Sequence, residues 1–209
     1  MTDLLLVTAD QDAEFTVNAL LKRHLAQFGI GTFTYKVIRN IGRDSGCRTD
    51  SVELLRDLQL QYRYAIVLFD FEGCEPPNNA SKTAVAAKLE QDLSRNGWRG
   101  RCKAVLIDPE LENWIWTRHD RMARSIGWPG TDELYGWLAQ KGLITPDATK
   151  PPRPKESFEA AIDVSDIELS ASLFEEIAEG APLSRCTDPA FLELMGQLAE
   201  CFPKDAENA

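Results

Sequence analysis

The sequence is poor in the residues on which several common kinds of active site depend. It has only two histidines, His24 and His119, among 209 residues. Its five cysteines are scattered and include no C-x-x-C pair, which argues against a disulfide framework and against a zinc ribbon. No G-x-S-x-G motif is present to support a serine-hydrolase triad. We therefore expect a protein of the reducing cytoplasm that does not depend on imidazole, thiol or serine chemistry.

Segments for membrane insertion and for phosphate-loop binding are also missing. The first apolar run, residues 4–7, follows no basic residue and is far too short for a signal peptide or a membrane span. No P-loop pattern occurs, and residues 29–31 supply only two glycines of a G-x-G-x-x-G motif, after a predicted helix instead of a strand. We expect no membrane association and no nucleotide binding through such loops.

Basic residues are outnumbered, because the formal net charge is -10 at pH 7. This charge opposes non-specific nucleic-acid binding over the whole surface. The distribution is uneven, since no basic residue lies between Lys155 and Arg185, and residues 156–179 carry eight carboxylates that predict a solvated helical surface. Basic residues gather elsewhere in the sequence and allow a local basic face: Arg95, Arg99, Arg101, Lys103, Arg118, Arg121 and Arg124.

Apolar residues, in contrast, make up 44% of the chain and follow a regular pattern. Short apolar runs predict strands over residues 4–8, 32–38, 64–69 and 103–107. Helical spacing predicts helices between them, over residues 15–28, 50–60 and 81–93, and residues 40–49 are predicted to form a flexible polar loop. Strands that alternate with helices indicate an α/β fold with a mostly parallel, Rossmann-like sheet.

The chain is long enough for one domain and an appendage. We predict an α/β domain over residues 1–130. A helix and a proline-rich linker should follow over residues 131–154, because four prolines fall between positions 146 and 154. Residues 155–209 should form a helical C-terminal region.

Acidic residues follow two of the predicted strands directly. Asp70 and Glu72 come after one strand, and Glu110 and Glu112 come after the next. Ligands of parallel sheets bind beyond the carboxyl ends of the strands, and carboxylate oxygens are the ligands that Mg²⁺ prefers. Carboxylates from both strand ends are therefore candidates to share one ion. The alternative is that these acids are solvated loop residues or helix caps.

A second candidate surface lies just beyond these acids. Arg118, Arg121 and Arg124 are spaced to share one face of a predicted helix, next to Trp114 and Trp116. Arginines beside exposed aromatic rings can bind a strand of DNA or RNA. Equally, the tryptophans can belong to the core, and the arginines can pair with the acidic C-terminal helices.

The order of the acidic motifs resembles the Toprim-like family of uncharacterised proteins found among bacterial phage-defence genes. The resemblance covers residues 4–126. In that family a first strand ends in V-E-G-x-x-E, a central strand in D-x-x-G or D-x-D, and a later strand leads into P-E-x-E-x-W-L. This chain has V-T-A-D-Q-D at 7–12, D-F-E-G at 70–73 and P-E-L-E-N-W at 109–114. The second and third elements match, whereas the first departs from the pattern.

The resemblance implies a metal-dependent nuclease, a hydrolase that cleaves phosphodiester bonds with Mg²⁺ or Mn²⁺. By that resemblance Asp70, Glu72 and Glu112 would hold the ion and Glu110 would assist. Thr8 stands where the family has its glutamate, the proposed general acid and base. Threonine cannot exchange a proton at neutral pH as a carboxylate can, which leaves Asp10 or Asp12 as substitutes.

A shorter resemblance, over residues 174–177 and 185–194, is to small components of methylation-associated defence systems. It implies action within a complex with other defence proteins. The alternative to an enzyme is therefore a non-catalytic recognition or scaffold subunit, which Thr8 favours. A third hypothesis, an acidic inhibitor that mimics nucleic acid, ranks last because the best-placed acids follow buried strands instead of forming a surface stripe.

Overall fold

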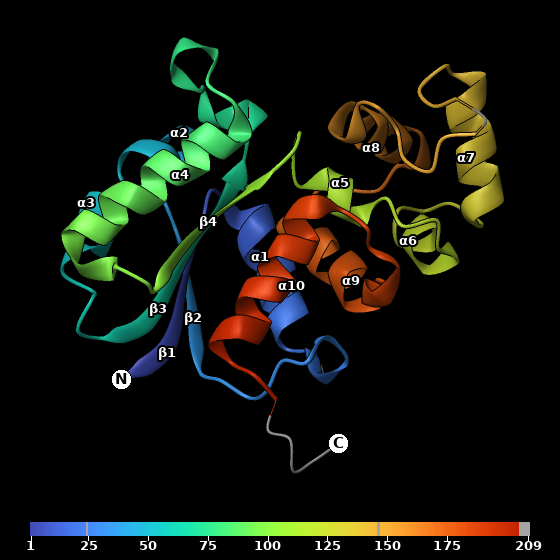
Figure 1. The fold of residues 1–209 in the computed structure, drawn as a ribbon. Coiled ribbons are helices and arrows are strands. Elements are labelled where there is room, and N and C mark those ends of the chain that lie inside the picture. Colours follow the sequence, from blue (N-terminus) through green and yellow to red (C-terminus); the bar gives the residue numbers. More distant parts are fainter. Residues whose placement is uncertain (24, 146, 205–209) are drawn as a thin grey trace.

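Four parallel strands form the centre of the molecule, in the order β2-β1-β3-β4 (Figure 1). They are β1 (Thr2–Thr8), β2 (Tyr35–Arg39), β3 (Tyr62–Asp70) and β4 (Cys102–Ile107). The structure is a computed structural model and describes residues 1–23, 25–145 and 147–204. The inner strands β1 and β3 each contain an uninterrupted apolar run, residues 4–7 and 65–69, because both faces of the sheet are covered there. The predicted α/β class with a parallel, Rossmann-like sheet is confirmed.

Helices cover both faces of this sheet. One face carries α2 (Arg43–Thr49), α3 (Ser51–Arg56) and α4 (Lys82–Leu93), which pack on side chains such as Leu5 and Val67. Trp98, in the turn Ser94–Trp98 (η4), is fully buried in this layer. Its indole N–H donates a 3.1 Å hydrogen bond to the carbonyl oxygen of Leu55. This bond joins α3 to the turn after α4.

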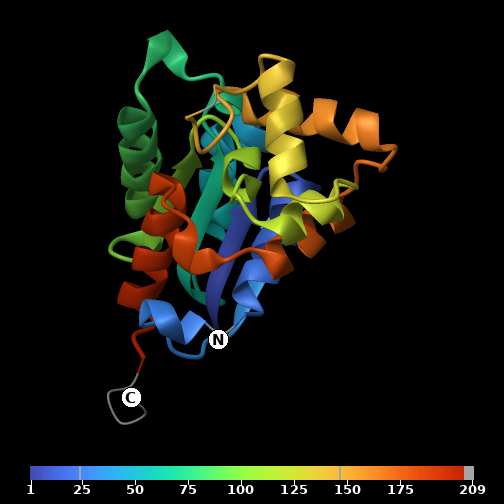
Figure 2. The same cartoon turned by 90° about the vertical axis from the view of Figure 1, so that its right-hand side faces the viewer.

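The other face is covered by α1 (Gln11–Leu21) and α10 (Pro189–Cys201), and α9 (Ala171–Gly180) packs against α1. Figure 2 shows α10 in front of the strands on this side. Alternate residues of β1, such as Leu4 and Leu6, face this layer, as the two-residue period of a strand requires. The single helix predicted over residues 15–28 is two elements in the structure, α1 and the 3-10 turn η1 (Leu25–Phe28). His24, between them, lies outside the described residues.

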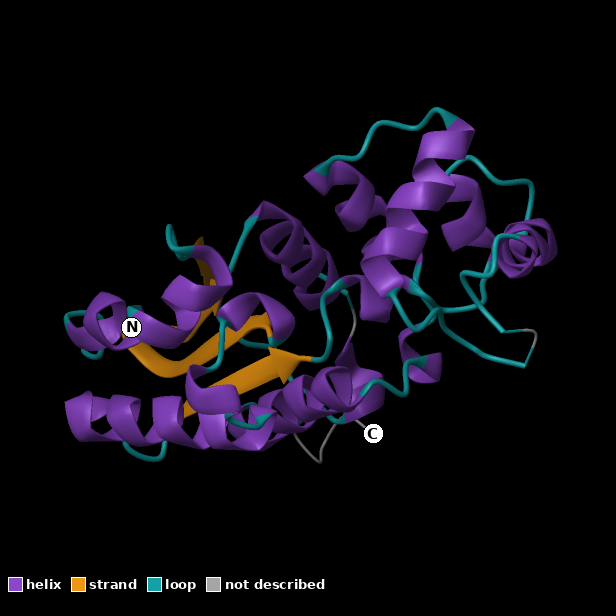
Figure 3. Ribbon diagram, turned by 90° about the horizontal axis from the view of Figure 1, so that it is seen from above, coloured by secondary structure: helices purple, strands orange, loops and turns teal. Residues whose placement is uncertain are grey.

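A third group of helices stands to one side of the sheet (Figure 3). It comprises α5 (Glu112–Ile115), α6 (Asp120–Ser125), α7 (Thr131–Gln140) and α8 (Pro154–Ser165). One apolar cluster runs from the sheet through these helices and includes Trp116, Phe158 and Phe174. The C-terminal helices therefore share a core with the sheet. The division at residues 130 and 154 stays a prediction.

Residues 40–49 were predicted to form a flexible loop, and this prediction is wrong because α2 begins at Arg43. The side chain of Asn40 accepts a 2.9 Å hydrogen bond from the N–H of Gly42 and so shapes the turn that precedes the helix. Gly46 lets the helix approach Asn40 closely, since a Cβ there would lie 2.5 Å from the side-chain oxygen of Asn40. Cys47 then anchors α2 in the core.

The chain returns to the start of the sheet at its last described residues. Ile30 forms an isolated antiparallel bridge with Pro203. The N–H of Gly31 donates to the carbonyl of Phe202, and the N–H of Lys204 donates to the carbonyl of Gly29, both at 2.8 Å. Four short turns complete the structure: η2 (Glu72–Cys74), η3 (Pro77–Asn79), η4 and η5 (Leu183–Arg185). Within the described ranges, none of the helices has the length and apolar character needed to cross a bilayer.

Candidate functional site

The carboxyl ends of the strands lie at the top of the sheet in Figure 1. Acidic residues follow several of these strand ends. Asp70 is the last residue of β3. Asp10 follows the end of β1 and caps α1 by accepting a 2.9 Å hydrogen bond from the N–H of Ala13. Glu112 opens α5 just after β4. The three neighbouring strands thus each lead to a carboxylate at the same edge, as the sequence predicts for Asp70 and Glu112.

Asp44, on α2, also belongs to this cluster. Its Oδ1 accepts a 2.8 Å hydrogen bond from the backbone N–H of Asp70. Its Oδ2 lies over Gly73, where a Cβ would come within 2.5 Å of that oxygen. Asp44 is therefore wedged between the end of β3 and the turn η2, and its carboxylate is fixed beside Asp70.

Burial and mutual repulsion shift the protonation of these acids. Burial, and then the charges of Asp44 and Glu112, raise the pKa of Asp70 well above its usual value. Burial raises the pKa of Glu112 to about 7, and this side chain is only 7% exposed. The pKa values of Asp12 and Asp44 are raised as well, first by burial, with a further contribution from the charge of Asp10. The cluster therefore resists carrying its full negative charge without a cation.

Lys155 is the basic residue whose charge lowers the pKa values of most of these carboxyl groups. It lies in the first turn of α8, and its charge lowers the pKa values of Glu112 and Glu110. Its backbone N–H also donates a 3.2 Å hydrogen bond to Oε1 of Glu110. A helix of the C-terminal region thus completes the charge arrangement at the end of the sheet.

The structure places Glu72 and Thr8 differently from Asp70 and Glu112. The side chains of Asp70 and Glu72 would point the same way if the strand continued to residue 72, but β3 ends at Asp70 and the exposed Glu72 begins the turn η2. Thr8 is fully buried, and its hydroxyl lies 3.4 Å from the carbonyl oxygens of Ile38 and Asp10. It offers no carboxylate at the end of β1. Asp10 is the nearest acid along the chain.

Magnesium or another hard cation fits the chemistry of these donors. Asp44, Asp70 and Glu112 offer carboxylate oxygens, and a divalent ion would offset the charges of Asp44 and Glu112 that raise the pKa of Asp70. Over residues 1–23, 25–145 and 147–204, however, no three Asp, Glu, His or Cys side chains are already arranged as a set of metal ligands. The carboxylates would have to converge on an ion when it binds.

The arginine patch predicted beyond the acids differs from expectation. Helix α6 begins only at Asp120, where the imidazole Nδ1 of His119 accepts from the N–H of Arg121, so Arg118 lies outside the helix. Arg118 stacks on Tyr135, with its guanidinium carbon 4.5 Å from the ring centroid. The prediction that three arginines share one helical face is therefore wrong.

The two tryptophans beside this patch are core residues. Trp114 is 5% exposed and Trp116 is 1% exposed, which leaves neither ring open for stacking on a base. Each indole N–H has a partner inside the protein, Asp188 for Trp114 and the carbonyl of Pro154 for Trp116. The alternative interpretation of these residues as packing residues is confirmed.

Sequence reasoning missed two members of the site. Asp44 was missed because residues 40–49 read as a loop, although the pair Asp44 and Cys47 at helical spacing was a usable signal. Lys155 was missed because its place depends on how α8 docks, and nothing local in the sequence indicates that.

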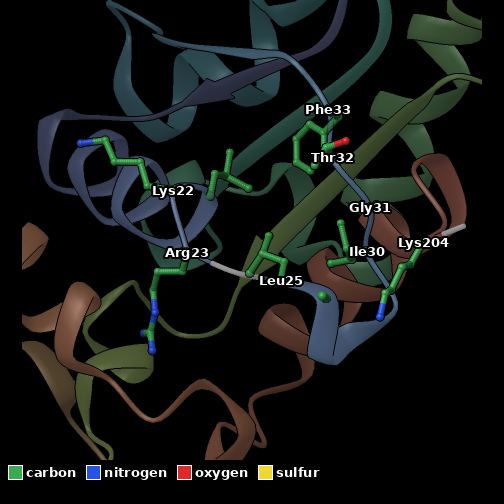
Figure 4. A pocket seen from close by; sticks show the side chains of 10 residues that line it. Lys22, Arg23, Leu25, Ile30, Gly31, Thr32, Phe33 and Lys204 are labelled. Carbon is green, nitrogen blue, oxygen red and sulfur yellow. The ribbon is translucent and has the colours of Figure 1, made fainter. Parts of the chain in front are cut away.

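Another cavity, of about 420 Å³, lies near η1 and Lys204, at the edge where the strands start (Figure 4). Its cationic side chains point in different directions and are partly engaged. Lys22 pairs with Glu175 at 3.0 Å, and the guanidinium of Arg23 donates to the carbonyls of Ala178 and Ala181. We therefore do not assign this cavity to the acidic site.

Comparison with protein-family models, with curated proteins and with solved structures finds no match. The fold and the acidic cluster define the class of protein. The chain is an α/β protein with four parallel strands between helices and an acidic cluster at the carboxyl edge of its sheet.

Proposed function

We propose that this chain is a Toprim-like component of an anti-phage defence system, with a site that cleaves phosphodiester bonds with Mg²⁺ or Mn²⁺. The observation that carries the proposal is the position of Asp70 at the end of β3, hydrogen-bonded to Asp44, where the charges of Asp44 and Glu112 both raise its pKa. The motif resemblance over residues 4–126 supports the family. Of the predicted metal ligands we keep Asp70 and Glu112, and we add Asp44.

The residues of the site have separate roles in this proposal. A bound divalent ion would stabilise charge on the phosphate and lower the pKa of a water molecule. Asp44, Asp70 and Glu112 would hold that ion. Glu110 accepts a hydrogen bond from the backbone N–H of Lys155, so it would keep the first turn of α8 in position beside the metal ligands. Glu72 lies near Glu110, whose pKa its charge raises, so it stays a candidate outer ligand.

The proton-transfer step is where this chain departs from the family. The last residue of β1 is the buried Thr8, which carries no carboxylate. Asp10 and Asp12 are the substitutes, and Asp10 already accepts the N–H of Ala13 as a helix cap. Asp12, with its raised pKa, is the better candidate to accept a proton.

Calorimetric titration with MgCl₂ and MnCl₂, paired with cleavage assays on DNA and RNA, tests this function. Asp70→Asn and Glu112→Gln should abolish ion binding and cleavage, whereas Asp57→Asn, an exposed acid elsewhere, should change neither. Wild-type protein that binds these ions only at millimolar concentrations and cuts no nucleic acid would exclude the enzyme.

The second candidate function is a non-catalytic recognition subunit of a multi-protein defence complex. The buried hydroxyl of Thr8 favours it, since the end of β1 lacks the expected acid and base. It predicts stable co-purification with proteins encoded beside it, and loss of that association when exposed residues of α8 and α9 are altered. Arg118, Arg121 and Arg124, all exposed, remain a proposed contact for DNA or RNA in either case.

A further inference from the structure

A cleft of about 790 Å³ opens beside the acidic cluster, between the start of α1 and the loop after β2. Its lining includes three acids and three basic residues, namely Asp10, Asp12, Glu14, Arg39, Arg43 and Lys155. Arg39 is already paired, since its Nε lies 2.7 Å from Oε2 of Glu14. Arg43 and Lys155, by contrast, make no ion pair within 4.0 Å in the part of the chain that the structure describes.

These two cations come from distant parts of the sequence and face the same acid. Both lower the pKa of Asp12, which burial and the charge of Asp10 raise. Lys155 also lies close enough to Glu112 to lower its pKa. Lys155 therefore acts both on Asp12, which lines the cleft, and on Glu112, one of the proposed metal ligands. It links the cleft to the proposed metal site.

The position of Lys155 is held by contacts of the backbone around it. The indole N–H of Trp116 donates a 3.0 Å hydrogen bond to the carbonyl of Pro154, and the N–H of Lys155 donates to Glu110. Both bonds hold the first turn of α8 against the acidic edge. The ammonium group takes part in neither bond, and Lys155 is an exposed residue that lines the cleft, so its side chain is available to a ligand.

We propose that this cleft binds the phosphodiester backbone of a single nucleic-acid strand, with Arg43 and Lys155 as its phosphate contacts. The proposal rests on the proposed function for the place of the reacting bond, which would lie between Lys155 and the metal ligands. Phosphate oxygens accept charge-assisted hydrogen bonds from arginine and lysine. They also coordinate a hard cation, which explains why free cations and clustered carboxylates occur side by side.

Fluorescence anisotropy with a labelled single-stranded oligodeoxynucleotide, in EDTA and in CaCl₂, tests the cleft. Arg43→Met and Lys155→Met should each weaken binding by roughly tenfold, because a lost hydrogen bond to a charged group is worth about 1.5 kcal/mol. Each should also reduce the slope of log K against log salt by about 0.7. Lys155→Met leaves the backbone contact to Glu110 in place, and Lys155→Arg should restore most of the affinity.

Arg99→Met is the matched control, since Arg99 is exposed and precedes β4 at the opposite edge of the sheet. Unchanged affinity in both cleft variants would overturn the proposal, as would a loss confined to Arg118→Met, Arg121→Met or Arg124→Met. Calorimetry with MgCl₂ separates the two proposals. Intact ion binding without binding of the oligonucleotide refutes only the cleft, whereas strand binding that depends on Arg43 and Lys155 but is accompanied by no Mg²⁺ binding refutes only the metal site.

Discussion

The backbone N–H of Asp70 donates a 2.8 Å hydrogen bond to Oδ1 of Asp44. This bond joins the last residue of β3 to α2 and places two carboxylates beside each other at the edge of the sheet. It stabilises the position of Asp70 while the charge of Asp44 raises the pKa of Asp70. The structure thus holds a repulsive pair in place, and this arrangement leads to the first prediction.

Asp44→Ala should lower the free energy of unfolding by about 2 kcal/mol, because it leaves the N–H of Asp70 without an acceptor. Asp44→Asn keeps an oxygen at this position and removes a charge, so its stability without metal should match or exceed that of the wild type. Both variants should weaken binding of Mg²⁺. Urea denaturation and calorimetry measure the two effects, and equal stability of both variants would show that the hydrogen bond contributes nothing.

The raised pKa of Glu112 predicts how stability depends on pH. Below pH 4.5 this group is protonated in both the folded and the unfolded chain. Between pH 4.5 and about 7 the unfolded chain ionises first, so this group should lower stability progressively, by a total on the order of 3 kcal/mol. Denaturation curves from pH 4.5 to 8 without metal should show this fall.

Glu112→Gln provides the control for that pH series, because glutamine does not titrate. The fall in stability between pH 4.5 and 7 should be smaller in this variant, and millimolar Mg²⁺ should reduce the fall in the wild type. An equal change in the free energy of unfolding between pH 4.5 and 7 in the wild type and in Glu112→Gln would contradict the prediction.

Asp188 is buried at the start of α10 and holds the C-terminal helices to the sheet region. Its Oδ1 accepts 2.9 Å hydrogen bonds from the indole of Trp114 and from the N–H of Ala190, and its Oδ2 accepts from Asn113. Asp188→Ala should lower the free energy of unfolding by about 3 kcal/mol, through loss of the cap and of the buried partner of Trp114. Asp188→Asn should lower the free energy of unfolding by about 1 kcal/mol. If both variants are as stable as the wild type, Asp188 does not hold these helices in place.

Thr16 and Thr117 each bury a hydroxyl that has no hydrogen-bond partner among the described residues. Both line the same small, mostly apolar cavity of about 20 Å³. Thr16→Val keeps the branched shape and removes one unpaired polar atom, so the free energy of unfolding should rise by about 1 kcal/mol. Thr16→Ser, which keeps the hydroxyl and loses the methyl group, should lower it. A loss of stability in Thr16→Val would mean that the hydroxyl does have a partner.

The sequence predicts the sheet well because its strands depend on local apolar runs. The run that ends at Asp70 is buried on both faces, so composition alone identifies it. The acids after β3 and β4 were found for the same reason, since the carboxyl ends of parallel strands share an edge.

The features that escaped prediction depend on contacts between distant segments. Helix α2 has two glycines in or next to it, and it forms because Asn40 shapes its start and Cys47 is buried. Lys155 reaches the site only because α8 docks on Glu110 and Trp116. The helix expected to carry three arginines starts late because His119, and no residue before it, supplies the cap.

The bridge between Ile30 and Pro203 has a practical consequence for handling the molecule. It brings the last described residues to the edge where the strands begin (Figure 1), whereas the residues that line the cleft follow the ends of β1 and β2. A fluorophore or a surface tether attached through Lys204 would therefore leave the cleft facing solution. Immobilised protein should bind a long strand as freely as untethered protein does.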